Sequence, residues 1–156
     1  MTDESGTDAS RPVVDADLGV VLDVVVDALS GRGRLTVLRV RWHRDDPLAV
    51  VLELSAQPDH PSLPRGSWVV LRDFLRYGLE ERTGDGVVRI WPDDIRDRVW
   101  LELERYGRPA CISLPRPVVA EFLALTDRQV PSGGEAAGAA VDAAVDALVE
   151  RLQREG

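Results

Sequence analysis

The sequence predicts a single α+β domain built on antiparallel β-sheets. Apolar and polar residues alternate in several consecutive runs, short turns rich in glycine, proline and aspartate separate those runs, and a helical period appears in only a few places. Strands that follow one another through short turns pair antiparallel, whereas a parallel sheet needs a long crossover between strands. With 156 residues, 44% of them hydrophobic, the chain is long enough for one domain of ordinary size.

The first half of the chain predicts a series of strands. Alternating apolar residues indicate strands at about 18–28, 35–42, 48–55 and 68–71. Gly31 and Gly33 lie in a turn between the first two strands, which predicts a hairpin, and Asp46-Pro47 breaks the chain before the third. Three prolines between residues 57 and 66 predict a loop before the fourth strand.

The second half predicts a short helix, three strands and two further helices. Apolar residues at helical spacing from Leu71 to Leu79 indicate the short helix, with Gly78 near its end. Strands are expected at 87–91, 99–105 and 110–114, with a turn at 107–109. Pro115 and Pro117 suit the first turn of a second helix, in which Val118, Phe122 and Leu125 would share one face.

Charge and composition divide the chain into three parts. Residues 1–17 hold five acids and one arginine without apolar periodicity, so we expect a disordered acidic tail that folding does not require. Residues 18–131 form the predicted α+β domain. Residues 132–156 read as a glycine-rich joint and an amphipathic C-terminal helix whose apolar stripe includes Leu148 and Leu152.

The sequence predicts a cytoplasmic protein without catalytic, cofactor or metal sites. No apolar stretch approaches the ~20 residues of a membrane span, and the acidic N-terminus is unlike a signal peptide. Cys111 is the single cysteine, and we interpret it as a small buried strand residue. His43 and His60 lie far from it in sequence, no pair of residues has the spacing of metal ligands, and paired acids lie in turns or at element ends. These patterns predict a protein that is not an enzyme.

Nucleic-acid binding is the alternative that the composition leaves open. The net charge is −8, but the two acidic ends carry most of it, so the body of the chain is nearly neutral and lacks a dense basic stripe. Strand residues could still form a stacking and charge platform for a single strand, namely Arg39, Arg41, Trp42, Arg89, Trp91 and Trp100. We favour the interpretation that the tryptophans pack at sheet edges or subunit contacts, which makes nucleic acid an unlikely partner.

Four segments of the chain resemble the SsgA-like proteins of sporulating actinomycetes. They are Asp46-Pro-Leu-Ala-Val50, Trp68-Val-Val-Leu-Arg-Asp-Phe-Leu75, Gly84-Asp-Gly-Val-Val-Arg-Ile-Trp-Pro92, and the stretch from Phe122 to Glu135 with its Pro131-Ser-Gly-Gly turn. The segments stand in the family's order and spacing, and the resemblance covers about residues 24–152. Leu48 stands where the family segment has tyrosine, and Val87 stands where aspartate is usual.

This resemblance implies a fold similar to the Whirly proteins, assembled as a cyclic homotrimer. It also implies a non-enzymatic regulator that controls septum placement and cell-wall remodelling in sporulation-specific division, and that acts at the division septum. One member of the family recruits the tubulin-like division protein FtsZ. The expected partners are therefore FtsZ, or another division protein, or another SsgA-like protein.

Residues of the recognisable segments divide into two expected roles. Candidate partner or trimer contacts are Trp68, Arg72, Arg89 and Trp91, because tryptophan and arginine are enriched at interface hot spots. Structural motif residues are Asp46, Pro47, Asp73, Gly78, Gly86 and Pro92. Asp73 suits the positive end of a helix dipole, Gly78 is expected to end that helix with positive φ, and Pro92 is expected to end a strand.

Overall fold

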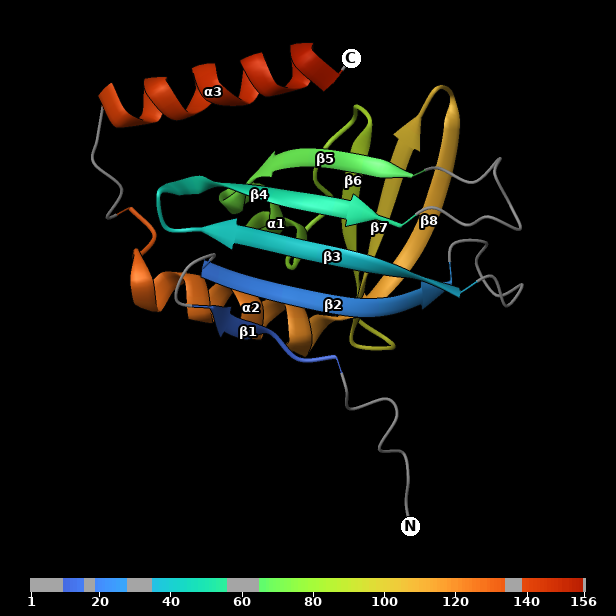
Figure 1. Ribbon diagram of the computed structural model, residues 1–156. Coiled ribbons are helices and arrows are strands. Elements are labelled where there is room, and N and C mark those ends of the chain that lie inside the picture. The colour runs from blue at the N-terminus through green and yellow to red at the C-terminus, as the bar shows by residue number, and fades with distance from the viewer. Residues whose placement is uncertain (1–9, 16–18, 28–34, 56–64, 134–138, 156) are drawn as a thin grey trace.

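A five-stranded antiparallel sheet forms one layer of the computed structural model, which describes residues 10–15, 19–27, 35–55, 65–133 and 139–155 (Figure 1). Its strands, in spatial and sequence order, are β1 (Val13–Asp15), β2 (Gly19–Asp27), β3 (Leu35–His43), β4 (Asp46–Leu54) and β5 (Gly66–Leu71). Each strand follows its neighbour in sequence, so the sheet is a simple meander.

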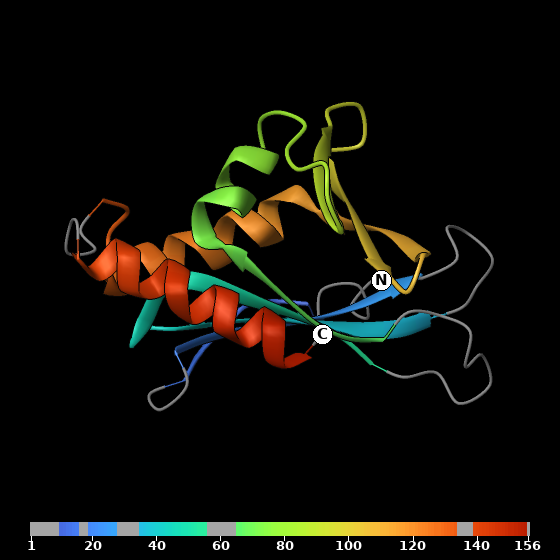
Figure 2. The ribbon, with the colours of Figure 1, turned by 90° about the horizontal axis from the view of Figure 1, so that it is seen from above.

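A three-stranded sheet and two helices cover one face of the larger sheet. The smaller sheet contains β6 (Val88–Asp93), β7 (Arg98–Arg105) and β8 (Arg108–Pro115), again antiparallel and in sequence order. Helices α1 (Arg72–Gly78) and α2 (Arg116–Gln129) lie on the same side as this sheet, whereas α3 (Ala139–Glu155) contacts β4 and β5 (Figure 2). The predicted α+β class with antiparallel sheets is confirmed.

Strand periodicity places the core between the two sheets. Val20, Leu22, Val24 and Val26 are at most 4% exposed, whereas Val25 on the opposite face of β2 is 61% exposed. The same alternation on the other strands buries one face of each sheet against α1 and α2. This arrangement leaves the second face of the three-stranded sheet, and part of that of the five-stranded sheet, outside the core.

The tail expected over residues 1–17 is wrong for its described part. Val13–Asp15 forms β1, which pairs antiparallel with the start of β2, and Arg11 forms an ion pair with Glu121 of α2 at 3.6 Å. A three-residue strand at a sheet edge is too short to show an alternating pattern, so periodicity could not reveal it. Residues 1–9 and 16–18 lie outside the described residues.

Two motif residues differ from their expected backbone roles. Gly78 does not have positive φ; a Cβ at this position would lie 2.3 Å from Cγ2 of Ile90, so α1 needs glycine to approach β6 closely. Pro92 does not end β6 but lies within it, opposite Val99. Because β6 is an edge strand, proline is tolerated there without breaking a ladder on both sides.

Gly84, rather than Gly86, is the restricted glycine in the turn before β6. Gly84 has φ of 91°, and a Cβ there would lie 2.5 Å from the carbonyl oxygen of Val88. A Cβ at Gly86 would meet no atom within 4 Å, so nothing in the structure explains a structural requirement for glycine at this position.

The helices begin close to their expected positions. Pro115 is the N-cap of α2, and the buried residues of α2 are Val119, Phe122, Leu123 and Thr126. Of the face expected for this helix, Phe122 is fully buried, and Val118 and Leu125 pack partly buried against the core. In α3, Leu148 is buried and Leu152 is 48% exposed.

The expected turn at Gly31 and Gly33 and most of the proline-rich loop lie outside the described residues. Within the described part, no helix is long and apolar enough to cross a bilayer.

Candidate interaction surface

Arg72, one of the four candidate contacts, is buried inside the chain. Its side chain has no exposed surface, and its Nη1 donates hydrogen bonds to the carbonyl oxygen of Val130 at 2.8 Å and to Oγ1 of Thr126 at 3.3 Å. The same atom lies 3.5 Å from Oδ1 of Asp127, and the guanidinium lies 5.6 Å from the ring centre of Trp42. A cation at these carbonyls complements the negative C-terminal end of α2.

Three of the four segments that resemble the SsgA-like family therefore meet at Arg72. Trp42 is 1% exposed and its Nε1 donates to the carbonyl oxygen of Pro47 at 2.8 Å, which connects the Asp46-Pro47 segment to the same cluster. One turn further along α1, Arg76 forms a two-point pair with Asp127, with both N–O distances 2.9 Å, and also contacts Asp73. The two-point carboxylate pair of this cluster is thus made by Arg76 and not by Arg72. This cluster holds α1 to the C-terminal end of α2.

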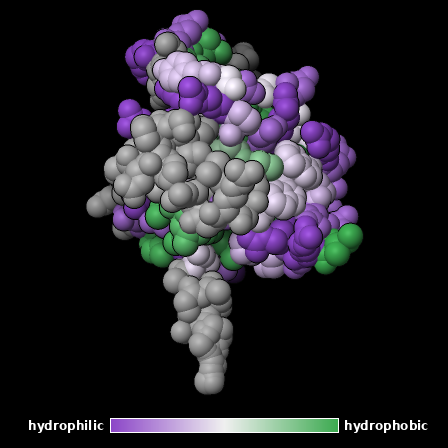
Figure 3. All heavy atoms as spheres, turned by 90° about the vertical axis from the view of Figure 1, so that its right-hand side faces the viewer, coloured by the Kyte–Doolittle hydropathy of each residue, from purple (hydrophilic) through white to green (hydrophobic). Residues whose placement is uncertain are grey.

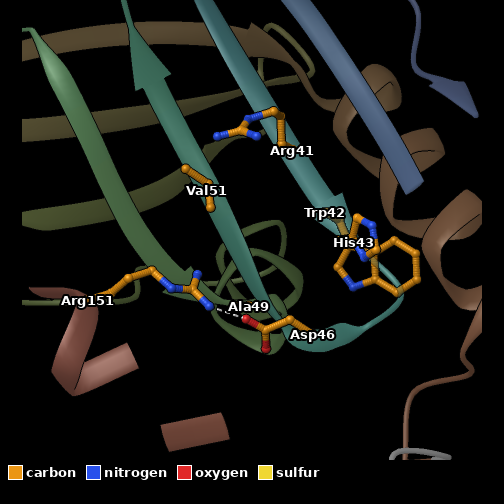
Figure 4. A pocket seen from close by; sticks show the side chains of 7 residues that line it. All are labelled: Arg41, Trp42, His43, Asp46, Ala49, Val51 and Arg151. Carbon is orange, nitrogen blue, oxygen red and sulfur yellow. Dashed lines mark hydrogen bonds and ion pairs between the residues drawn. The ribbon is translucent and has the colours of Figure 1, made fainter. Parts of the chain in front are cut away.

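Asp46 connects the sheet to α3. Its carboxylate accepts a hydrogen bond from Arg151, and both side chains line a small pocket of about 80 Å³ (Figure 4). Arg41 also lines this pocket, and its Nη2 donates to Glu53 at 2.6 Å. Because each of these arginines has a carboxylate partner, the pocket carries little uncompensated charge and is best explained as the junction between α3 and β4.

Of the other three candidate contacts, Trp68 is buried at 4% exposure, whereas Arg89 and Trp91 lie on the uncovered face of the three-stranded sheet. We call this surface the small-sheet face; its residues, all half-buried, are Arg89, Trp91, Trp100, Glu102, Cys111 and Ser113. Trp91 lies directly opposite Trp100, and Arg89 lies opposite Glu102, to which its Nη1 donates at 3.0 Å. Arg82 places its guanidinium 4.8 Å from the ring centre of Trp91.

A hydrogen bond fixes Trp100, one of the two tryptophans of this face. Nε1 of Trp100 donates to Oδ2 of Asp93 at 3.2 Å, and this bond, with the nearby Arg96, holds the pKa of Asp93 below its usual value. Burial raises the pKa of the Cys111 thiol, and the charge of Glu102 raises it further, so this thiol is not an activated nucleophile. The expected burial of Cys111 is only partly confirmed, because it is half-buried on the outer side of β8.

The small-sheet face continues into a hollow beside the larger sheet. A volume of about 400 Å³ lies between Trp100, Arg98 and Ser113 on one side and Val25 and Leu35 on the other. Val25 and Leu35 are 61% and 58% exposed. We did not expect this hollow from the sequence, although two apolar residues on the polar sides of their strands were a signal for it.

The nucleic-acid platform that the sequence left open as an alternative is not assembled on one surface. Arg39 and Arg41 lie on the outer face of β3, where they pair with Asp23 and Glu53, whereas Trp42 is buried on the inner face. Arg89, Trp91 and Trp100 belong to the other sheet.

No cluster of histidine, cysteine or carboxylate residues in the described part of the chain could hold a metal ion. Figure 3 shows a mostly hydrophilic face with a few separate hydrophobic areas.

Comparisons with known proteins identify the family. The family model described as Streptomyces sporulation and cell division protein SsgA matches residues 36–135. The sporulation-specific cell division protein SsgB of Thermobifida fusca is 32% identical over 102 residues, which cover 64% of this chain and 71% of the relative. A sporulation-specific cell division protein of Frankia casuarinae is 30% identical over 123 residues, or 76% of this chain and 81% of the relative.

Solved structures agree with this assignment. A structure from work on SsgB mutations and longitudinal cell division during sporulation of Streptomyces coelicolor covers 73% of this chain and 90% of its own, with 26% identity and a TM-score of 0.59. An SsgA-like sporulation-specific cell division protein from Thermobifida fusca shares the fold over 90% of this chain and 98% of its own, with 23% identity and a TM-score of 0.60. This chain belongs to the SsgA family of sporulation and cell division proteins.

Proposed function

We propose that the chain is a non-enzymatic adaptor that brings division proteins to the sporulation septum, and that the small-sheet face with its hollow is where a partner binds. The paired Trp91 and Trp100 are the observation that carries this proposal. They present rigid aromatic surface outside the core, and tryptophan is the side chain most enriched at interface hot spots. The partner that the family resemblance implies is FtsZ, or another SsgA-like protein.

The charges of the small-sheet face favour a protein partner over a nucleic acid. Arg89 is paired with Glu102, and Arg96 with Asp93, while Arg82 stacks on Trp91 and Arg98 bonds to Ser113, so part of the positive charge of this aromatic surface is compensated. A phosphate backbone would be recognised by unpaired cations along a groove, whereas protein interfaces combine an aromatic centre with a polar rim. The hollow beside Trp100 adds apolar surface from Val25 and Leu35 that a partner side chain could cover.

A pull-down from a sporulating culture tests this function. The tagged wild-type chain is expected to capture FtsZ or another division protein, identified by mass spectrometry, and Trp91→Ala combined with Trp100→Ala is expected to lose that partner. Tyr77→Ala is the matched control, because Tyr77 is an exposed aromatic residue (57%) of α1, outside the small-sheet face. Equal capture by all three chains would contradict the assignment of the surface.

We also propose a homotrimer, which follows from the family resemblance. The support within this chain is apolar surface on β3 outside the hollow, such as Val37, which is 38% exposed, whereas the main sheet contacts of α3 are with β4 and β5. Light scattering at tens of micromolar is expected to give three times the chain mass of 17.1 kDa. A mass of one chain would remove the trimer from the mechanism.

A further inference from the structure

The hairpin turn between β7 and β8 contains a strained, exposed tyrosine. Tyr106 and Gly107 form a two-residue turn closed by the pairing of Arg105 with Arg108, and their φ angles are 54° and 73°. Both values are positive, as in a type I′ turn, whose first position favours asparagine, aspartate or glycine. A bulky aromatic residue in this conformation is an outlier, yet the side chain is 85% exposed, so packing within the chain does not explain it.

Beside this tyrosine lies an apolar pocket of about 230 Å³. Its floor includes Trp68, whose ring is 4% exposed and fixed by the bond from Nε1 to the carbonyl oxygen of Glu104 at 3.0 Å. Val87 and Leu152, which are 55% and 48% exposed, form further parts of the wall. The pocket has the size of one large aliphatic or aromatic side chain.

Arg105 is a preorganised cation at this pocket. Its guanidinium lies 6.0 Å from the ring centre of Trp68 and 5.4 Å from that of Tyr106, and Nη1 lies 3.5 Å from the carbonyl oxygen of Ser67. Gly66 beneath it allows this position, because a Cβ there would lie 3.2 Å from Nη1. Among the described residues, Arg105 has no carboxylate within ion-pair distance.

Neighbouring charges leave this cation largely uncompensated. Arg108 lies directly opposite Arg105 across the hairpin, so both side chains project from the same face of the sheet. Glu104 is the acidic residue of the pocket rim, but the alternation of β7 directs its side chain to the opposite face. An apolar pocket beside an unneutralised, aromatic-stacked arginine is complementary to an apolar side chain next to a carboxylate.

We propose that this pocket, formed by Trp68, Val87, Arg105, Tyr106 and Leu152, binds a short acidic and apolar peptide segment of a partner protein. The apolar side chain enters the pocket against Trp68 and Tyr106, and the adjacent carboxylate pairs with Arg105. The pocket is separate from the small-sheet face, so the proposal goes beyond the adaptor surface. If this pocket binds no peptide, the proposed adaptor surface is not affected. It also gives Tyr106 a reason to occupy a turn position that asparagine would suit better.

Fluorescence anisotropy with a labelled peptide tests this proposal. The probe is a peptide of about ten residues in which aspartates alternate with phenylalanine and leucine, titrated with the full chain. We expect saturable binding that weakens with salt, and a loss of about five- to tenfold or more for Arg105→Gln. A matched peptide with asparagine in place of aspartate, or alanine in place of the apolar residues, is expected to bind more weakly than the probe.

Tyr106→Asn separates binding from folding. Asparagine suits the left-handed turn position, so this variant is expected to keep or raise the melting temperature while it weakens peptide binding about fivefold or more. Ile95→Asn is the control, because Ile95 is an exposed apolar residue (96%) of the other hairpin of the same sheet, and its binding is expected to equal that of the wild type.

Three results would overturn the proposal. The first is the absence of saturable binding by the wild-type chain, and the second is equal binding by wild type and Tyr106→Asn. The third is a change in the oligomeric mass of Tyr106→Asn measured by light scattering, because the pocket would then be occupied by a second copy of this chain.

Discussion

Arg72 and Arg89 stand 17 residues apart in the two most recognisable segments of the chain, yet their surroundings differ completely. Arg72 has no exposed side-chain surface and bonds to the C-terminal end of α2, whereas Arg89 lies on the open small-sheet face, where its partner is Glu102. The first arginine holds elements of the fold together, and the second lies on the surface that we propose for a partner. The same residue type in a family motif therefore lies in two different environments.

Removal of the buried arginine is the strongest test of this contrast. Arg72→Met is expected to lower the free energy of unfolding by about 3 kcal/mol, because it leaves the buried carbonyl of Val130 without this donor and removes a cation from the helix end. Arg76→Met, one turn away and 29% exposed, is expected to cost about 1 kcal/mol or less. Urea denaturation measures both, and equal losses would show that burial does not distinguish the two arginines.

Two glycines of the family segments give a second comparison between a residue that packing restricts and one that it does not. Gly78→Ala places a methyl group against Ile90, which is 1% exposed, and is expected to destabilise the chain by about 1–3 kcal/mol through overpacking. Gly86→Ala meets no atom within 4 Å and is expected to be neutral or slightly stabilising, because alanine restricts the unfolded chain. Thermal unfolding of the two variants checks this order, and a larger loss at Gly86 would contradict it.

Substitution of a residue on the small-sheet face is expected to have a smaller effect on stability. Trp91→Ala removes the side chain that lies opposite Trp100 in the sheet and the cation–π contact with Arg82, and the loss is expected to be about 1 kcal/mol. Partner capture should nevertheless fall strongly, since half of the paired aromatic surface is lost. A stability loss as large as that of Arg72→Met would place Trp91 with the structural residues.

The sequence predicted the elements better than it predicted which side chains they expose. Strand alternation identified the buried face of β2 because burial on a sheet follows a period of two, and the order of the later strands and helices followed from turn residues. It missed β1, whose three residues are too few to show a period. The expected strand end at Pro92 failed because the edge position of β6 depends on the arrangement of the whole sheet.

The sequence predicted the residue types of the candidate site but not their positions, because those positions also depend on the arrangement of the whole fold. Trp68 and Arg72 are typical interface residue types, but whether such residues are buried depends on packing between α1, α2 and the two sheets. The pairing of Trp91 with Trp100 depends on the register of β6 and β7, and the hollow beside them depends on how the two sheets meet. The Tyr106 pocket required backbone angles, since only the positive φ shows that the position disfavours tyrosine.

The smallest expected effect concerns Asp93, which fixes Trp100 at the edge of the small-sheet face. Because the hydrogen bond from Trp100 lowers the pKa of Asp93 in the folded chain, the charged carboxylate contributes stability above the usual aspartate pKa of about 3.9, and this contribution is lost as the pH falls through the lowered value.

Asp93→Asn keeps an oxygen that can accept the bond from Trp100 but removes the charge. We therefore expect a slightly lower melting temperature than the wild type at pH 7, and a difference that shrinks toward zero as the pH is lowered to about 3 and below. Asp45→Asn, an exposed acid in the turn before β4, is the control and should shift the melting temperature less at pH 7. A difference at Asp93 that stays constant between the two pH values would mean that the carboxylate charge does not stabilise this edge of the small-sheet face, and that the position of the Trp100 indole does not depend on it.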